Sequence, residues 1–148
     1  GWPHDAKRWL RRLPARLTSA DPAVIASLLA WTTALLLVGH GALAAIVAKP
    51  VLASQFALVG LPSSAIAIAG WLEMIAAVLV VVRPSPPLLF TIMAWKMATE
   101  ALYPISGTPI WEFIERAGSY AAPLALALIL IDSGSSHVTA ITLRRRSR

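Results

Sequence analysis

Four ionisable side chains lie inside otherwise apolar stretches of the sequence: His40, Glu73, Lys96 and Glu100. Charged groups are costly within a bilayer, and such residues usually face the interior of a helix bundle, where they pair or mark a functional site. Lys96 and Glu100 are four residues apart, so they share one helix face. Helix rise places Glu73 and Lys96 each about 15 Å into its stretch. An interhelical bridge between Glu73 and Lys96 is therefore expected, because it lowers the burial cost of both charges.

His40 lies between Gly39 and Gly41, and glycines let another helix or a flat ligand approach closely. A haem ligand is one interpretation of this histidine. A lone membrane histidine is more often hydrogen-bonded to a neighbouring helix, and the apolar stretches hold no second histidine for bis-histidine ligation. The sequence therefore predicts no metal site, and no haem or pigment ligated by this chain alone.

Aromatic residues accompany the charges. Trp71 and Trp95 lie near Glu73 and Lys96 in sequence, and Tyr103 belongs to the helix face of Lys96. These rings either line a pocket for a quinone headgroup or pack in the bundle with an indole donor to satisfy. The packing role is the more common one.

A second polar group, Glu115, Arg116 and Tyr120, follows near the start of the last apolar stretch. These residues either extend the charged cluster toward water or anchor the chain at the membrane surface, since Trp111 and Tyr120 also fit an aromatic belt.

Composition restricts the class of protein. Apolar residues make up 57% of the 148-residue chain and charged residues only 14%, with a mean hydropathy of +0.70. A soluble helical bundle is the alternative, but its helices would carry polar outer stripes, which these stretches lack. The absence of cysteine excludes disulfides, thiolate metal sites and iron–sulfur ligation, so any redox role must rest on a bound cofactor or a partner.

The elements that must position these residues are helices. The sequence predicts an all-α protein: a four-transmembrane-helix bundle preceded by an amphipathic interfacial helix in residues 1–20. A signal peptide is the competing interpretation of the N-terminal part, but the apolar run is too long for one. The transmembrane domain is predicted at residues 21–132 and includes a semi-polar connection at 51–61. A basic tail follows at 133–148. The predicted spans are residues 23–47, 63–82, 86–105 and 109–131.

Basic residues predict the orientation. Nine of the thirteen lie in the two tails, and Arg83 lies between the second and third spans. Such flanks indicate topology and lipid headgroup contact, not nucleic-acid binding, despite the net charge of +6. The positive-inside rule places both termini in the cytoplasm, in a bacterial-type inner membrane.

Three motifs resemble the DoxX-like family of small four-helix membrane proteins. They are residues 39–43 leading to Lys49 and Pro50, the connecting segment 56–62, and residues 70–73, which end in Glu73. The resemblance covers about residues 30–131 and implies a link to quinone-coupled membrane oxidoreductase assemblies, with His40 and Glu73 as the positions that carry any family function. Lys96 does not map onto the family pattern.

Three functions are therefore weighed. The first is a non-catalytic accessory subunit of a larger membrane redox complex that carries electron transport, packed against lipid and other integral membrane subunits. The second is a quinone-interacting oxidoreductase subunit of DoxX type, with Glu73 or His40 exchanging protons. The third is a small transporter, which would have to form a homo-oligomer because four spans make no pathway alone. The chain has no nucleotide motif or metal-ligand cluster, and the accessory role is the preferred expectation.

Overall fold

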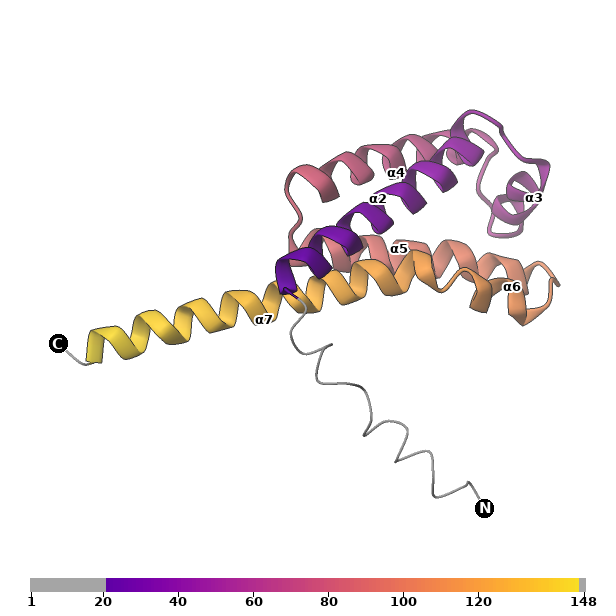
Figure 1. Cartoon of the computed structure of the whole chain (residues 1–148). Helices are drawn as coiled ribbons and strands as arrows, with labels where there is room; N and C mark the ends of the chain where they lie inside the picture. The colour runs from indigo at the N-terminus through magenta and orange to yellow at the C-terminus, as the bar shows by residue number, and fades with distance from the viewer. Residues whose placement is uncertain (1–20, 147–148) are drawn as a thin grey trace, which may run out of the picture.

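A computed structural model describes residues 21–146, with side chains as far as residue 133. This part of the chain is all-helical and has no strand, which confirms that the fold is all-α (Figure 1). The predicted interfacial helix of residues 1–20 lies outside the described residues. The helices are α2 (Pro22–Ala45), α3 (Pro50–Leu58), α4 (Ser64–Val82), α5 (Pro86–Ile105), α6 (Ile110–Glu115) and α7 (Gly118–Arg146).

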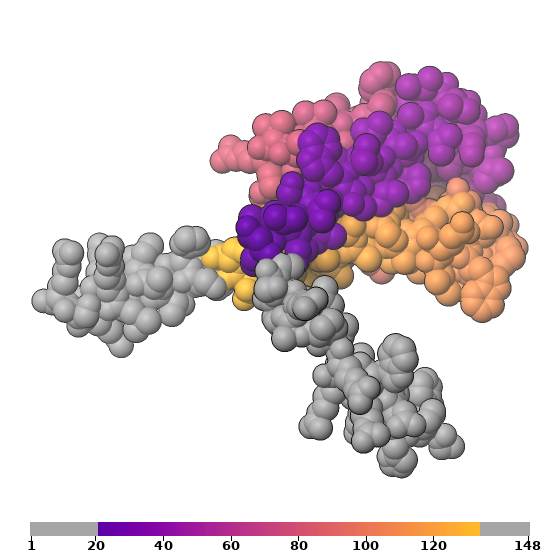
Figure 2. Space-filling model, viewed as in Figure 1, coloured from indigo at the N-terminus to yellow at the C-terminus, as the bar shows by residue number. Residues whose placement is uncertain are grey.

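The long helices form two hairpins, α2 with α4 and α5 with α7, and each hairpin carries a short helix in its connection. Figure 1 shows these short helices, α3 and α6, at the same end of the bundle. The hairpins meet through α2, which packs against both α4 and α7 (Figure 2). The backbones of α4 and α5 touch little, so side chains must fill the space between them.

Glycines reverse the chain where α3 and α5 end. After α3, the Leu61 N–H donates to the Phe56 carbonyl at 3.0 Å, and Gly60 has a φ of 75°. This is the Schellman arrangement, in which a left-handed residue ends the helix. Gly107, with a φ of 88°, ends α5 in the same way. Both turns lie at the end of the bundle that carries α3 and α6.

The contact between α2 and α4 is made backbone to backbone at Gly41 and Gly70. A Cβ built on Gly41 would lie 2.6 Å from the Gly70 carbonyl oxygen, and one on Gly70 would lie 2.6 Å from the Gly41 oxygen. A Cβ on Gly39, in contrast, would meet nothing within 4 Å. Of the two glycines beside His40, Gly41 therefore provides the close helix approach, and Gly39 does not.

The apolar surface of the molecule matches a membrane environment. A buried core runs between the long helices, and large apolar side chains such as Leu28, Leu35, Leu72 and Val78 are exposed on the outer faces. In the described part, three helical segments are long and apolar enough to cross a membrane: α2 (Pro22–Ala45), α4 (Ser64–Val82), and Ile110–Ser133, which comprises α6 and the first part of α7. The chain is thus a multi-pass membrane protein whose apolar faces contact lipid.

Two connections differ from the sequence expectation. Residues 51–61 were expected as a semi-polar connection, and the structure shows that most of it is helix α3, which starts with Pro50 at the first helical position. The expected single helix over 109–131 is divided into α6 and α7. At the break, Arg116 Nη1 donates to the Glu112 carbonyl at 2.7 Å and so satisfies a carbonyl at the end of α6.

The two ends of the predicted transmembrane domain also differ. Helix α7 continues to Arg146, through the stretch expected as a basic tail. Helix α5 has the predicted bounds, 20 residues from Pro86 to Ile105, but it is not among the three apolar helices, because its buried face carries Lys96 and Glu100.

Candidate functional site

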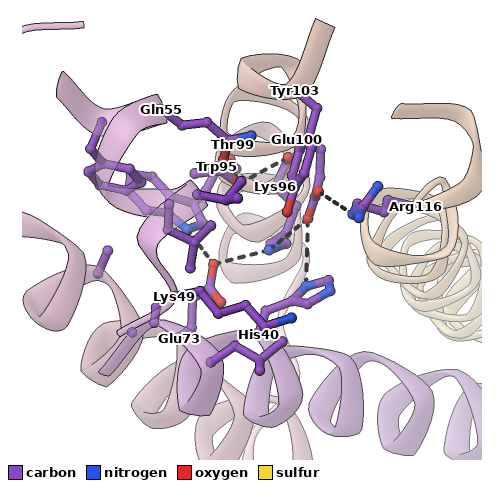
Figure 3. Close-up of a pocket in the computed structure, with 17 residues that line it drawn as sticks. His40, Lys49, Gln55, Glu73, Trp95, Lys96, Thr99, Glu100, Tyr103 and Arg116 are labelled. Carbon is purple, nitrogen blue, oxygen red and sulfur yellow. Dashed lines mark hydrogen bonds and ion pairs between the residues drawn. The ribbon is translucent and has the colours of Figure 1, made fainter. Parts of the chain in front are cut away.

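The charged side chains predicted from the sequence gather around a cavity at the end of the bundle that carries α3 and α6 (Figure 3). The cavity has a volume of about 350 Å³ and is lined by residues from α2, α3, α4 and α5, together with Arg116 and with Lys49, the N-cap of α3. One part of its wall is apolar, with Leu43, Leu52 and Phe56, and another part is charged. Four helices and the junction of α6 and α7 therefore build one site.

Lys96 is the centre of the charged part. Its Nζ lies 3.2 Å from Glu73 Oε1 and 3.1 Å from Glu100 Oε1. All three side chains are buried, with residue exposures of 3% for Lys96, 7% for Glu73 and 4% for Glu100. The interhelical bridge expected between Glu73 and Lys96 is present, and the pairing within α5 is present as well. Two carboxylates thus share one ammonium group.

Trp95 completes the link between α4 and α5. Its Nε1 donates to Glu73 Oε1 at 2.9 Å, the same oxygen that accepts from Lys96 Nζ. Because the backbones of α4 and α5 touch little, these two donors are the main polar connection between the hairpins on this side. Hydrogen bonds to an ionised carboxylate are stronger than neutral ones, so the Glu73 side chain is held in place.

Arg116 balances the second carboxylate. Its Nε lies 3.5 Å from Glu100 Oε2, and its Nη1 lies 2.6 Å from Glu112 Oε2. The guanidinium also stacks over the Tyr103 ring, 4.0 Å from the centroid, a favourable cation–π geometry. Lys96 and Arg116 together offset the charges of Glu73 and Glu100, while Glu112 stands nearer the surface.

The outer extension weighed from the sequence forms only in part. Arg116 joins the cluster, whereas Glu115 is exposed and Tyr120 donates its hydroxyl to the Phe113 carbonyl at 3.1 Å and stacks on the Phe113 ring. The carboxylate that pairs with Arg116 is Glu112, which the sequence analysis did not single out. The sequence feature that could have predicted this pair is the four-residue spacing between Glu112 and Arg116 within one amphipathic stretch.

His40 stands at the wall of the cavity with a free ring nitrogen. Its Nδ1 lies 3.6 Å from Glu100 Oε1, which is too long for a hydrogen bond, and this buried nitrogen has no hydrogen-bond partner. The two groups form an ion pair only when the imidazole is protonated. Among the described residues, no group of three His, Asp or Glu side chains is arranged to hold a metal ion.

The three aromatic residues proposed as pocket lining divide into two groups. Trp95 and Tyr103 line the cavity. Trp71 does not line the cavity and is 56% exposed on the outer face of α4. A helix turns about 100° per residue, so Trp71, two positions before Glu73, points away from the side that Glu73 faces. Closeness in sequence to Glu73 was therefore a poor guide for this residue.

Helix α3 supplies a wall that the sequence analysis missed. Its Val51, Leu52, Gln55 and Phe56 line the cavity, and Gln55 is only 1% exposed. The spacing of Leu52, Gln55 and Phe56 is that of one helix face, which was the available signal. A polar amide on the buried face of a short helix is the unusual feature of this wall.

In comparisons with protein-family models, curated proteins and solved structures, nothing matched the chain.

Proposed function

We propose that this chain is a membrane subunit of a redox complex and that its cavity holds the headgroup of a lipophilic ligand of the quinone class. The cavity of about 350 Å³ is the observation that carries the proposal. Small-molecule sites occupy about 300–1,000 Å³ and combine apolar walls with a few convergent polar groups. The apolar side chains of Leu52 and Phe56 suit a ring, and the charged side suits its oxygens.

Proton exchange is the chemistry that the charged side offers. Quinone reduction needs protons delivered to the ring oxygens, and a buried carboxylate or imidazole at the wall is a suitable carrier. Glu73 and His40 both line the cavity, and Lys96 Nζ lies 3.2 Å from Glu73 Oε1. The chain has no cysteine, so we assign the electrons to a partner subunit.

A purely structural accessory role is the second candidate, and the charge pairing favours it. Every buried carboxylate of the cluster has a cation partner within 3.5 Å, which is what a stabilising network requires. The apolar outer faces would then pack against partner helices. The open cavity favours the ligand-binding role instead. A polar network that only joins helices would be expected to be tightly packed, without such a cavity.

For the membrane arrangement, we infer that α5 is a fourth span, so that both chain ends lie on the cytoplasmic side and α3 and α6 on the opposite side. The length of α5 supports this, since 20 residues rise about 30 Å, and its charges are turned into the bundle. The resulting four-span bundle, with its histidine, glutamate and connecting segment, is the basis for our proposal that the chain is a DoxX-like protein of a bacterial-type inner membrane.

Single cysteines test this topology, because the chain has none of its own. Ser63 and Ser85 form a matched pair: each is the N-cap of a helix, α4 or α5, and neither side chain makes a capping hydrogen bond. We expect a membrane-impermeant maleimide to label Ser63→Cys and not Ser85→Cys in intact spheroplasts. Labelling of Ser85→Cys alone would reverse the orientation, and labelling of both would contradict the assignment of α5 as a span.

Purification of the native protein in mild detergent tests the function. We expect partner subunits to co-purify and lipid extraction to release a quinone in amounts close to one per chain. The Trp71→Phe variant, changed on the outer face, should retain the quinone. The Phe56→Trp variant, whose added ring volume enters the cavity, should lose it. Partner subunits without quinone in the unaltered protein would favour the structural role.

A further inference from the structure

Gln55 is the one neutral amide in the wall of the cavity, and nothing in the described part of the chain satisfies it. The residue is 1% exposed, and its buried Nε2 has no hydrogen-bond partner. A buried donor without an acceptor is destabilising, which is why most buried polar groups are paired. An unpaired donor in a cavity wall therefore indicates that the partner is a bound molecule.

The neighbouring cavity groups do not supply that partner. Glu73 Oε1 already accepts from Trp95 and Lys96, and no other cavity group accepts from Gln55 Nε2. Gln55 comes from α3 and lies across the cavity from Glu73 and His40 in the view of Figure 3. A molecule in the cavity would thus have the charged cluster on one side and the amide donor on the other.

The structure assigns Gln55 as the residue that selects the ligand, by donating a hydrogen bond from Nε2 to a carbonyl-type oxygen of the headgroup. This inference rests on the proposed function. It adds one requirement: the ligand must carry an acceptor oxygen on the side of its ring that faces α3. A ring without such an oxygen would leave the donor unpaired in the complex. Discrimination against such a ring follows, because a polar site rejects analogues that lack the matching group.

Helix α3 presents Gln55 on a short element with sharp boundaries. Pro50 starts the helix, and Gly60 reverses the chain directly after it. Phe56, next to Gln55, is buried at 7% exposure and belongs to a small apolar cluster with Ile66, Ala69 and Leu102. This packing keeps the buried face of α3 turned toward the cavity, so the amide is held in place before a ligand arrives.

Substitution of Gln55 by methionine tests the assignment. Methionine has nearly the same length and shape but no donor. The purified chain in detergent is titrated with decylubiquinone, and with decylbenzene as a ring that has no oxygen. We expect Gln55→Met to bind decylubiquinone about 3- to 10-fold more weakly, the effect of losing one neutral hydrogen bond. Its binding of decylbenzene should not weaken.

Two further variants separate selection from a structural role. Gln55→Glu keeps the size and, at a pH where the new carboxyl is ionised, has no donor, so under that condition it should lose decylubiquinone binding at least as much. Ser54→Ala removes an exposed hydroxyl from the same helix that bonds only to the Val51 carbonyl, and it should bind like the unaltered protein. The ligand-free Gln55→Met protein should melt no lower than the unaltered protein, because the mutation removes an unpaired donor. A residue needed for folding would show the opposite.

The outcomes are distinct. If the unaltered protein binds decylubiquinone and Gln55→Met binds it equally well, the assignment of Gln55 is wrong and the proposed function stands. If the unaltered protein binds neither compound, the proposed function fails and the assignment fails with it. A lower melting temperature of ligand-free Gln55→Met, with equal loss of both compounds, would make Gln55 a structural residue.

Discussion

Replacement of Lys96 by methionine is expected to destabilise the bundle by about 3–5 kcal/mol, the usual cost of removing one partner of a buried ion pair. Lys96 is 3% exposed and its Nζ contacts both Glu73 and Glu100. The two carboxylates are not affected equally. Glu100 keeps Arg116, at 3.5 Å, while Glu73 keeps only the neutral Trp95 indole.

This asymmetry predicts which second mutation restores stability. The double variant with Lys96→Met and Glu73→Gln should recover much of the loss, because the amide removes the unpaired charge and still accepts from Trp95. The double variant with Lys96→Met and Glu100→Gln should recover less, since it leaves Glu73 ionised without a cation. The effects of Lys96→Met and Glu73→Gln on stability should therefore be strongly non-additive. Those of Lys96→Met and Glu100→Gln should be less so.

Thermal melting in one detergent measures these differences. It compares the unaltered protein, the single variants Lys96→Met, Glu73→Gln and Glu100→Gln, and the two double variants. Additive losses in the variant with Lys96→Met and Glu73→Gln would contradict the bridge between α4 and α5. Equal recovery by both double variants would mean that Arg116 does not support Glu100. The exposed Glu115→Gln variant, on the surface near Arg116, is the control and should melt like the unaltered protein.

The sequence was sufficient to predict the polar centre of the site, and the reason is energetic. A charge in an apolar helix must be turned inward and paired, and few partners are available at the same depth. For Glu73, Lys96 and Glu100 these conditions left little freedom, and the structure has the pairs. The bounds of α5 were also predictable, because a serine followed by proline starts it and a glycine turn ends it.

The remaining walls were not predictable from one sequence, because they depend on tertiary position. Helix α3 is 9 residues long, too short for its periodicity to stand out from a polar connection. At the break between α6 and α7 the guanidinium of Arg116 reaches the Glu112 backbone carbonyl, a contact that composition does not reveal. Trp71 and Trp95 both lie near a charged residue in sequence, but Trp71 is two positions from Glu73 and points away from its side of the helix, whereas Trp95 lines the cavity.

The two glycines between α2 and α4 lead to the second large effect. Gly70→Ala is expected to destabilise the protein by about 3 kcal/mol, near the upper end of the usual range for overpacking. The new Cβ would lie 2.6 Å from the Gly41 carbonyl oxygen, 2.7 Å from the Ala45 nitrogen and 2.8 Å from the Ala45 Cβ. None of these atoms is the end of a flexible side chain, so the two helices must separate.

The sign of this effect separates packing from helix propensity. Alanine is normally the better residue within a helix by about 1 kcal/mol, so propensity alone predicts that Gly70→Ala stabilises. Gly39→Ala is the matched control, because its Cβ would meet nothing within 4 Å, and it should melt at the same or a higher temperature. Loss of stability in both variants would trace the effect to something other than the contact of α2 with α4.

The same glycine contact also determines the shape of the site. Gly41 is adjacent to His40, and Gly70 precedes Glu73 by three residues on α4, so separation of the two helices moves His40 away from Glu73. If the chain binds a quinone as we propose, Gly70→Ala is expected to lose it during detergent purification at temperatures where the protein is still folded, while Gly39→Ala keeps it. Retention of quinone by a folded but destabilised Gly70→Ala protein would show that the cavity does not depend on the spacing of α2 and α4.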